Sequence, residues 1–118
     1  MTETRVSSQL HELSAIQAAA LIRQRQLSPV ELVQALIARA ESVDQHVRAW
    51  QRLDAERALE AARLAEQAAG STTDLPPLHG VPFGAKDIYD TAGLQTTCGF
   101  RPYADRVPAV DSEPVARL

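Results

Sequence analysis

The sequence predicts an α/β fold that is not complete within its 118 residues. Apolar residues recur at helical spacing, with breaks, from about residue 13 to residue 69. A short apolar segment over residues 81–88 is typical of a buried strand. Residues 111–118 begin one more amphipathic helix that the sequence does not continue. Because much of the 45% hydrophobic fraction is alanine, we expect a thin core that needs more protein around it.

Two capping signals open the first two predicted helices. Ser14, followed three residues later by Gln17, forms a capping-box pattern. Ser28 is a stronger start, because Pro29 suits the first helical position and Glu31 closes a second box. The helix that follows has an apolar stripe at helical spacing. Its members are Leu32, Val33, Leu36, Ile37 and Ala40.

A third helix is predicted after a short segment, residues 47–53, that has weak strand character. Asp54 is its expected N-cap and Gly70 its expected C′ glycine. One face of this helix consists of small side chains, which permits close approach to a neighbouring element. These are Ala58, Ala61, Ala62, Ala65 and Ala68.

The predicted strand over Val81–Ile88 is the first β element. Alternation places Val81, Phe83 and Ala85 on one face and Gly84 and Lys86 on the other. A glycine-containing loop follows, and Asp111 or Ser112 can cap the last helix, with Pro114 in its first turn. Since that helix stops after about one turn, we expect the chain to be a truncated part of a larger domain.

Composition excludes several classes of function. The net charge is −3 and no Lys/Arg block stands out, so nucleic-acid binding is not expected. No segment resembles a signal peptide or a membrane span, which favours a cytoplasmic protein without membrane contact. Cys98 is the single cysteine and is expected to be a small buried residue. No His/Cys/Asp/Glu spacing resembles a metal site, and we expect neither a metal nor a cofactor.

Lys86 is the candidate catalytic residue, because it lies on a strand that otherwise looks buried. Burial disfavours the charged form of a lysine, and a neutral amine is a competent general base. Paired with a serine, such an amine can activate a nucleophile without a histidine. The alternative is that Lys86 lies at a strand end and pairs with Asp87 or with another carboxylate.

The sequence around Lys86 resembles the first signature block of the amidase-signature family. The block consists of Leu78–Asp87 and Ala92–Gly99. The preceding segments Leu27–Leu32 and Leu53–Glu56 are similar to that family's N-terminal helices, and Asp111–Leu118 is similar to the helix after the block. The resemblance therefore covers nearly the whole chain.

The resemblance implies the fold and the chemistry. It implies N-terminal helices and the first strands of a large mixed β-sheet, in which residues 1–70 are mainly helical, residues 78–100 carry the lysine motif and residues 111–118 begin a truncated helix. It also implies that Lys86 is the base of a Ser-cisSer-Lys triad that hydrolyses the C–N bond of a carboxamide. No Gly/Ser-rich segment that could hold the two serines follows in this sequence. The chain alone is therefore expected to be inactive.

Three hypotheses remain open at this stage. The parent protein is an amidase acting on a small-molecule amide, or it is the A-type subunit of a glutamine-dependent tRNA amidotransferase. Alternatively, the chain is a non-catalytic truncated fragment. The sequence leaves a homodimer of the full-length protein open and does not identify the substrate.

Overall fold

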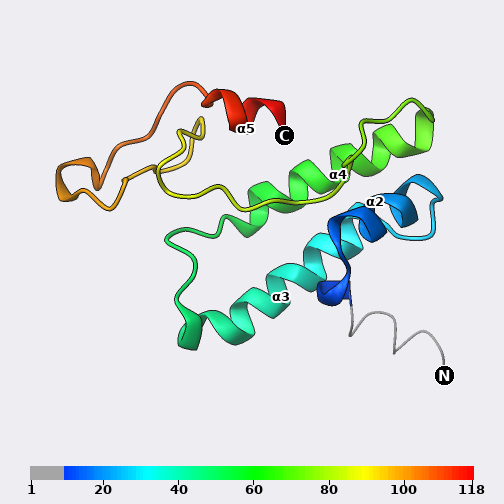
Figure 1. Cartoon of the computed structure of the whole chain (residues 1–118), viewed down its shortest axis with the longest axis horizontal. Coiled ribbons are helices and arrows are strands. Elements are labelled where there is room, and N and C mark those ends of the chain that lie inside the picture. Colours follow the sequence, from blue (N-terminus) through cyan, green and yellow to red (C-terminus); the bar gives the residue numbers. More distant parts are fainter. Residues whose placement is uncertain (1–9) are drawn as a thin grey trace. The chain divides into compact units, whose positions relative to one another are not determined.

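The computed structural model describes residues 10–118. The chain divides into two compact units, one formed by Met1–Pro82, described from residue 10 onward, and one formed by Phe83–Leu118. The first unit contains the 3₁₀ turn η1 (Leu10–Glu12) and the helices α2 (Ala15–Arg23), α3 (Pro29–Val47) and α4 (Ala55–Ser71). The second contains the 3₁₀ turn η2 (Arg101–Tyr103) and the short helix α5 (Glu113–Arg117) (Figure 1).

The predicted start of α2 is confirmed. The Ser14 hydroxyl accepts a hydrogen bond from the backbone N–H of Gln17 at 3.2 Å. The Gln17 side chain accepts one from the backbone N–H of Ser14 at 2.9 Å. Both halves of the capping box are therefore formed, and two of the N–H groups left free at a helix start are satisfied locally.

Ser28 caps α3 as predicted, although Glu31 does not form the reciprocal bond of the expected second capping box. Ser28 also joins α3 to α4. Its hydroxyl oxygen accepts hydrogen bonds from the backbone N–H groups of Val30 and Glu31 at 3.1 and 3.3 Å. The same hydroxyl donates to the carboxylate of Glu66 in α4. The partner of the hydroxyl proton is thus a residue 38 positions away, which the local capping pattern does not reveal.

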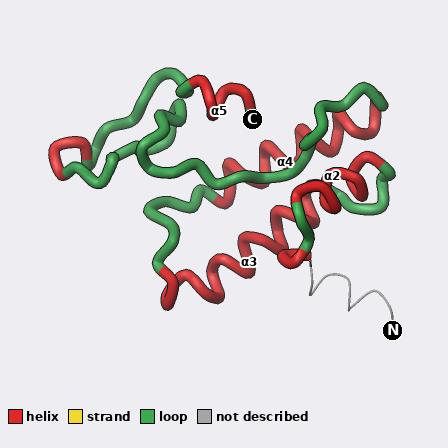
Figure 2. Tube along the Cα trace, in the orientation of Figure 1, coloured by secondary structure: helices red, strands yellow, loops and turns green. Residues whose placement is uncertain are grey.

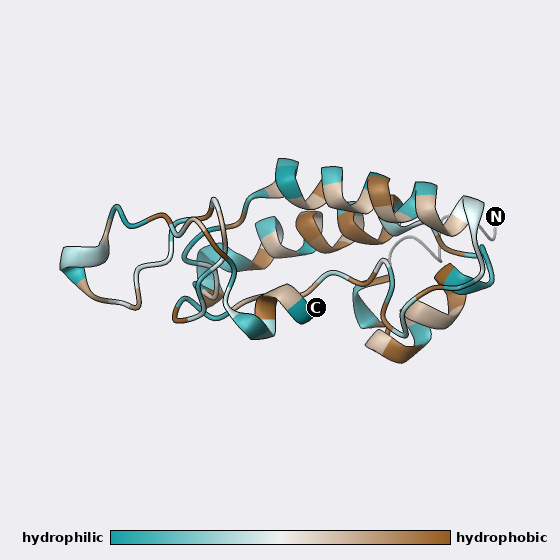
Figure 3. Cartoon of the chain, turned by 90° about the horizontal axis from the view of Figure 1, so that it is seen from above, coloured by the Kyte–Doolittle hydropathy of each residue, from teal (hydrophilic) through white to brown (hydrophobic). Residues whose placement is uncertain are grey.

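The core of the first unit lies where η1, α2 and α3 meet. Its buried residues are Leu10, Ala18, Ile22, Leu27 and Leu32. Val81 packs against this cluster from the end of the unit. A Cβ at Gly80 would lie 3.0 Å from Pro29 Cγ and 3.2 Å from Ile22 Cδ1, so these side chains would have to shift to admit it. Hydrophobic and hydrophilic residues alternate along the helices (Figure 3), as expected for helices with one apolar face.

Helix α4 begins as predicted and ends differently. The Asp54 carboxylate accepts the N–H of Arg57 at 3.1 Å, which confirms the N-cap. Ala62 and Ala69 are buried, and α4 packs along α3. The prediction of Gly70 as the C′ glycine is wrong, because the helix continues through Gly70 to Ser71. The Thr72 N–H then donates to the carbonyl of Ala68 and completes the last turn.

The segment over residues 47–53 does not form the weakly predicted strand. Val47 is the last residue of α3, and Arg48 ends the helix in the left-handed conformation with φ 53°. The Asp44 carboxylate then accepts the N–H groups of Ala49 and Trp50 at 2.7 and 3.2 Å. These backbone donors are used by a side chain, so they are not available to a β ladder.

The predicted strand over residues 81–88 is also absent from the described residues, 10–118, which contain helices, turns and loops (Figure 2). A strand needs a second strand for its N–H and C=O groups, and no other segment of this range supplies one. Turn bonds take their place. The Val81 N–H donates to the Leu78 carbonyl, and the Tyr89 N–H donates to the Lys86 carbonyl. The described chain is therefore helical, and it does not show the β part of the expected α/β fold.

Candidate functional site

Lys86 lies in the second unit, at the first position of a turn. The N–H of Tyr89 donates to the Lys86 carbonyl at 2.9 Å. The side chain is exposed, so the prediction that Lys86 lies on a buried strand is wrong for this chain. Within residues 10–118 the structure describes no ion pair of the Lys86 ammonium group. The turn fixes the backbone of Lys86, while the side-chain amine is exposed on the surface of the described chain.

Asp87 points its carboxylate to Thr97 instead of pairing with the neighbouring lysine. One carboxylate oxygen accepts the Thr97 N–H at 2.8 Å, and the other accepts the Thr97 hydroxyl. The Asp87 backbone carbonyl also accepts the N–H of Cys98 at 2.8 Å. Asp87 therefore closes the loop of residues 87–98 with three hydrogen bonds, and it does not form the Lys86–Asp87 ion pair considered above.

These bonds favour the ionised form of Asp87. The side-chain bond from Thr97 is the largest cause that lowers the pKa of Asp87, followed by the backbone bond from Thr97. Partial burial acts in the opposite direction, and the nearby positive charge of Lys86 is the smallest contribution. The carboxylate is thus held mainly by hydrogen bonding, as is common for carboxylates that accept several N–H and O–H donors.

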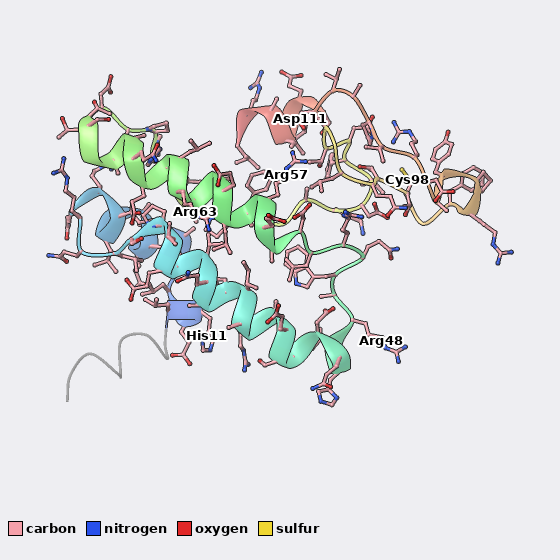
Figure 4. The ribbon with its side chains drawn as sticks, turned by 180° about the vertical axis from the view of Figure 1, so that it is seen from behind. His11, Arg48, Arg57, Arg63, Cys98 and Asp111 are labelled. Atoms are coloured by element: carbon pink, nitrogen blue, oxygen red, sulfur yellow. The ribbon has the colours of Figure 1, made fainter. Side chains whose placement is uncertain are left out.

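Two adjacent threonines of this loop are buried although they are polar. Thr96 is 2% exposed and Thr97 is 8% exposed. The Thr96 hydroxyl donates to the Leu94 carbonyl at 3.2 Å, and the Thr97 hydroxyl bonds Asp87, so both groups are satisfied. Cys98 follows with φ 55° and is exposed, in contrast to the expected buried residue (Figure 4).

A second carboxylate organises the next part of the unit. The guanidinium group of Arg106 donates two hydrogen bonds to Asp90, at 2.6 and 2.7 Å. These bonds lower the pKa of Asp90 and raise the pKa of Arg106. The backbone takes part as well. The Thr96 N–H donates to the Arg106 carbonyl at 3.0 Å, and the Ser112 N–H donates to the Asp90 carbonyl at 2.8 Å.

Two more bonds connect the two sides of this segment. The Asp111 carboxylate accepts the N–H of Ala92 at 2.6 Å, and the Pro108 carbonyl accepts the N–H of Gly93 at 2.9 Å. The segment after Lys86 is therefore a cross-linked loop and not an open connection. Sequence reasoning missed both the Asp87–Thr97 and the Asp90–Arg106 pairs, because the partners are 10 and 16 residues apart with no periodic signal.

The described serines serve the helices. Ser14, Ser28 and Ser112 are N-caps, although the Ser112 side chain makes no capping bond. The hydroxyls of Ser42 and Ser71 donate to helix carbonyls at 2.8 and 3.1 Å. Ser7 and Ser8 lie outside the described residues. The described part of the chain thus shows Lys86 without a hydrogen-bonded serine.

Three further properties concern the described residues alone. From residue 10 to residue 118 there is no group of three His, Cys, Asp or Glu side chains that could hold a metal ion. His79, the histidine nearest Lys86 in sequence, has its Nε2 2.8 Å from the carbonyl of Ala65. No helix in this part is both long and apolar enough to cross a membrane.

Comparison with known proteins identifies the family. The profile of the family described as Amidase matches residues 31–118, the range that contains α4, most of α3 and the whole second unit. This match covers well over half of the sequence and includes the Lys86 turn. The chain therefore belongs to the amidase family, also called the amidase-signature family.

Individual relatives agree with this assignment. The chain is 40% identical over 111 residues to a protein named as the A-type subunit of glutamyl-tRNA(Gln) amidotransferase from Roseiflexus sp. (strain RS-1), covering 92% of this chain and 22% of that protein. It is 40% identical over 110 residues to the protein of the same name from Moorella thermoacetica, covering 93% of this chain and 23% of that protein.

A relative with a different name is equally similar. A protein named acylamidase from Rhodococcus erythropolis is 40% identical over 111 residues, which cover 92% of this chain and 23% of that protein. The chain thus spans slightly less than a quarter of the length of these curated relatives. Identity of 40% to proteins of two names does not distinguish between their activities.

Proposed function

We propose that this chain supplies the base of an amidase that hydrolyses a carboxamide C–N bond, and that the base is Lys86. The activity would belong to a longer polypeptide that contains this chain, called the full-length protein below. The carrying observation is that the family match includes the Lys86 segment, and that two carboxylate-centred hydrogen-bond groups organise the loop directly after it.

The choice of Lys86 has a chemical reason. It is the single lysine of the 118-residue sequence, and the other basic side chains, apart from three histidines, are arginines. Arginine stays protonated in proteins and cannot accept a proton from a serine. If this chain contributes an amine base, Lys86 is the residue that provides it. Its amine is exposed here and pairs with no described carboxylate, so later parts of the full-length protein could enclose it.

The proposed reaction follows the triad chemistry of the family. The neutral Lys86 amine takes a proton from a serine that is held through a cis peptide, and this serine activates a second one. The second serine attacks the amide carbonyl and forms an acyl-enzyme. As the C–N bond breaks, the leaving nitrogen takes the proton back from the Lys86 ammonium through the first serine and departs as ammonia or an amine. Water then releases the acid. Both serines, and the N–H groups that stabilise the oxyanion, would come from the remaining length of the full-length protein.

The test is Lys86→Ala in the full-length protein, assayed for ammonia or amine release on a panel of linear carboxamides. Loss of a general base should reduce kcat/KM by roughly 10²-fold or more. Arg101→Ala removes an exposed positive charge from the same unit and is the control. Unchanged turnover in the Lys86→Ala protein, with circular dichroism showing a wild-type fold, would reject the proposal.

A second candidate is supported by the names of several relatives. The full-length protein would be the A-type subunit of a glutamine-dependent tRNA amidotransferase, releasing ammonia from glutamine for use on a charged tRNA. The discriminating measurement is glutamine hydrolysis by the purified full-length protein, with and without added partner subunits of such an amidotransferase. Hydrolysis of simple carboxamides without any partner favours the amidase. Glutamine hydrolysis that requires the partners favours the amidotransferase.

The third candidate, a non-catalytic product, applies to the 118-residue chain by itself. Its described serines cap helices or bond helix carbonyls, so none is arranged as a nucleophile beside Lys86. We expect no measurable turnover of any amide in the panel. Turnover by the purified chain that Lys86→Ala abolishes would show that it holds a complete site.

A further inference from the structure

We infer that Asp87 and Thr97 are positioning residues for Lys86: they hold the backbone that carries the base, and they keep the adjacent carboxylate from pairing with its amine. This inference rests on the proposed function of Lys86 and adds two residues to it. Both lie in the second unit together with Lys86, and both are joined by bonds that the structure describes.

The first part of the argument concerns the backbone. Lys86 is followed by a residue with three hydrogen bonds to one short segment, two to its carboxylate from Thr97 and one to its carbonyl from Cys98. The Lys86 carbonyl itself accepts the Tyr89 N–H. The chain is thus held at position 86 and at position 87. A base must reach its proton within hydrogen-bond distance, so an error of about 1 Å in this backbone would matter for the rate.

The second part concerns charge. An ion pair between Asp87 and Lys86 would stabilise the protonated amine, which is the form that cannot act as a base. In the structure both carboxylate oxygens of Asp87 face Thr97, one on its N–H and one on its hydroxyl. Among the causes that shift the pKa of Asp87, the positive charge of Lys86 is the smallest. Because Thr97 bonds both oxygens of the Asp87 carboxylate, the carboxylate nearest in sequence to Lys86 is not paired with its amine.

The segment around Thr97, which bonds Asp87, is fixed by further hydrogen bonds and by burial. Thr97 is 8% exposed, its carbonyl accepts the Phe100 N–H at 2.9 Å, and the following residue, Cys98, has the left-handed φ of 55°. The preceding Thr96 N–H donates to the Arg106 carbonyl, which connects the segment to the Asp90–Arg106 ion pair. The partner of Asp87 is a fixed part of the loop, which is what a positioning role requires.

The experiment compares pairs of conservative and disruptive variants in the full-length protein, with Lys86→Ala in parallel. Thr97→Val keeps the shape and removes the hydroxyl, whereas Thr97→Ser keeps the hydroxyl. Asp87→Ala removes both carboxylate bonds, whereas Asp87→Asn can still accept the Thr97 N–H. We expect kcat to fall roughly tenfold to hundredfold in Thr97→Val and Asp87→Ala with KM nearly constant. Thr97→Ser and Asp87→Asn should stay within about fivefold of the wild type.

Each outcome has a separate meaning. The kinetics use the carboxamide that the wild type hydrolyses fastest, and the folded fraction of each variant comes from urea unfolding. If Lys86→Ala keeps its activity, the proposed function fails and the positioning role fails with it. If Lys86→Ala is inactive while Thr97→Val and Asp87→Ala have wild-type kcat, the positioning role alone is overturned. If Asp87→Asn is as slow as Asp87→Ala, the negative charge matters and not the hydrogen-bonded position, which also overturns it.

A second measurement does not depend on activity. Amide hydrogen exchange at Thr97 should accelerate in Asp87→Ala, because its N–H loses the carboxylate acceptor. Exchange at Cys98 should accelerate with it, because the bond from its N–H to the retained backbone carbonyl of residue 87 belongs to the segment that the carboxylate holds. It should remain close to the wild type in Asp87→Asn. Equal exchange at both amides in all variants would mean that Asp87 does not hold this segment.

Discussion

Asp90 and Arg106 form a bidentate ion pair, with Arg106 Nη1 2.6 Å from Asp90 Oδ1 and Arg106 Nη2 2.7 Å from Asp90 Oδ2. Planar pairs of this kind fix orientation as well as distance, because both donors and both acceptors are used. The side chains are only 36% and 37% exposed, so this pair is less hydrated than the other ion pairs that the structure describes. It connects the two sides of the loop that follows Lys86.

The first prediction concerns this pair. Arg106→Lys keeps the charge but cannot form the two parallel bonds, so the loop should open more often. We expect amide exchange at Thr96 and Ser112 to become roughly twofold to fivefold faster, since their N–H groups donate to the carbonyls of Arg106 and Asp90. Arg117→Lys is the control, because its bond to Glu113 lies on an exposed face of α5. Unchanged exchange in Arg106→Lys would show that the second bond is not needed.

The second prediction concerns acid stability. The pKa of Asp87 is lowered in the folded chain, chiefly by the side-chain bond from Thr97. Above the ordinary pKa of about 3.9, Asp87 is ionised in both states, and its bonds contribute fully to stability. As the pH falls below that value toward the lowered pKa, the unfolded chain binds the proton first and the contribution is lost.

Asp87→Asn should therefore weaken the loss of stability on going from about pH 5 to pH 3, measured as the urea midpoint at each pH. Asp105→Asn, at an exposed position of the same unit, is the matched control. A steeper acid dependence in Asp87→Asn than in the wild type would contradict the direction of the shift.

The third prediction compares two glycines of the first unit. Gly80 has φ 80°, and a Cβ there would lie 3.0 Å from Pro29 Cγ and 3.2 Å from Ile22 Cδ1. Gly70 lies inside α4, and a Cβ there would meet no atom within 4 Å. We expect Gly80→Ala to lower the free energy of unfolding by about 1–2 kcal/mol or more. Gly70→Ala should raise it by about 0.5–1 kcal/mol. Urea unfolding measures both, and effects of equal sign would contradict the packing around Gly80.

The fourth prediction uses two isoleucines of α2. Ile22 is 2% exposed and lies in the core of the first unit, whereas Ile16 on the same helix is 79% exposed. Ile22→Ala should cost about 2–5 kcal/mol of unfolding free energy, because it removes buried apolar area and leaves a cavity. Ile16→Ala should change it by less than about 0.5 kcal/mol. Similar losses in both variants, measured by urea unfolding, would mean that α2 packs through a different face.

The part of the fold that followed from the sequence is local. Ser14, Ser28 and Asp54 start helices in the structure as predicted, because a cap acts on N–H groups only two or three residues away. The family also followed from a short block of sequence around Lys86, and the match over residues 31–118 confirms it. The end of α4 did not follow, since Gly70 is tolerated inside a helix wherever the next residues can still form its bonds.

Tertiary structure decided the features that depend on residues far apart in the chain. The apolar alternation over residues 81–88 is suited to a strand, yet a strand forms only beside another, and the described residues offer none. The same holds for Asp87 with Thr97, Asp90 with Arg106 and Ser28 with Glu66, whose spacings of 10, 16 and 38 residues carry no periodic signal. The sequence by itself therefore determined which residues cap these helices and to which family the chain belongs. Only the folded chain determined which distant groups they meet, because those contacts depend on how the loops close.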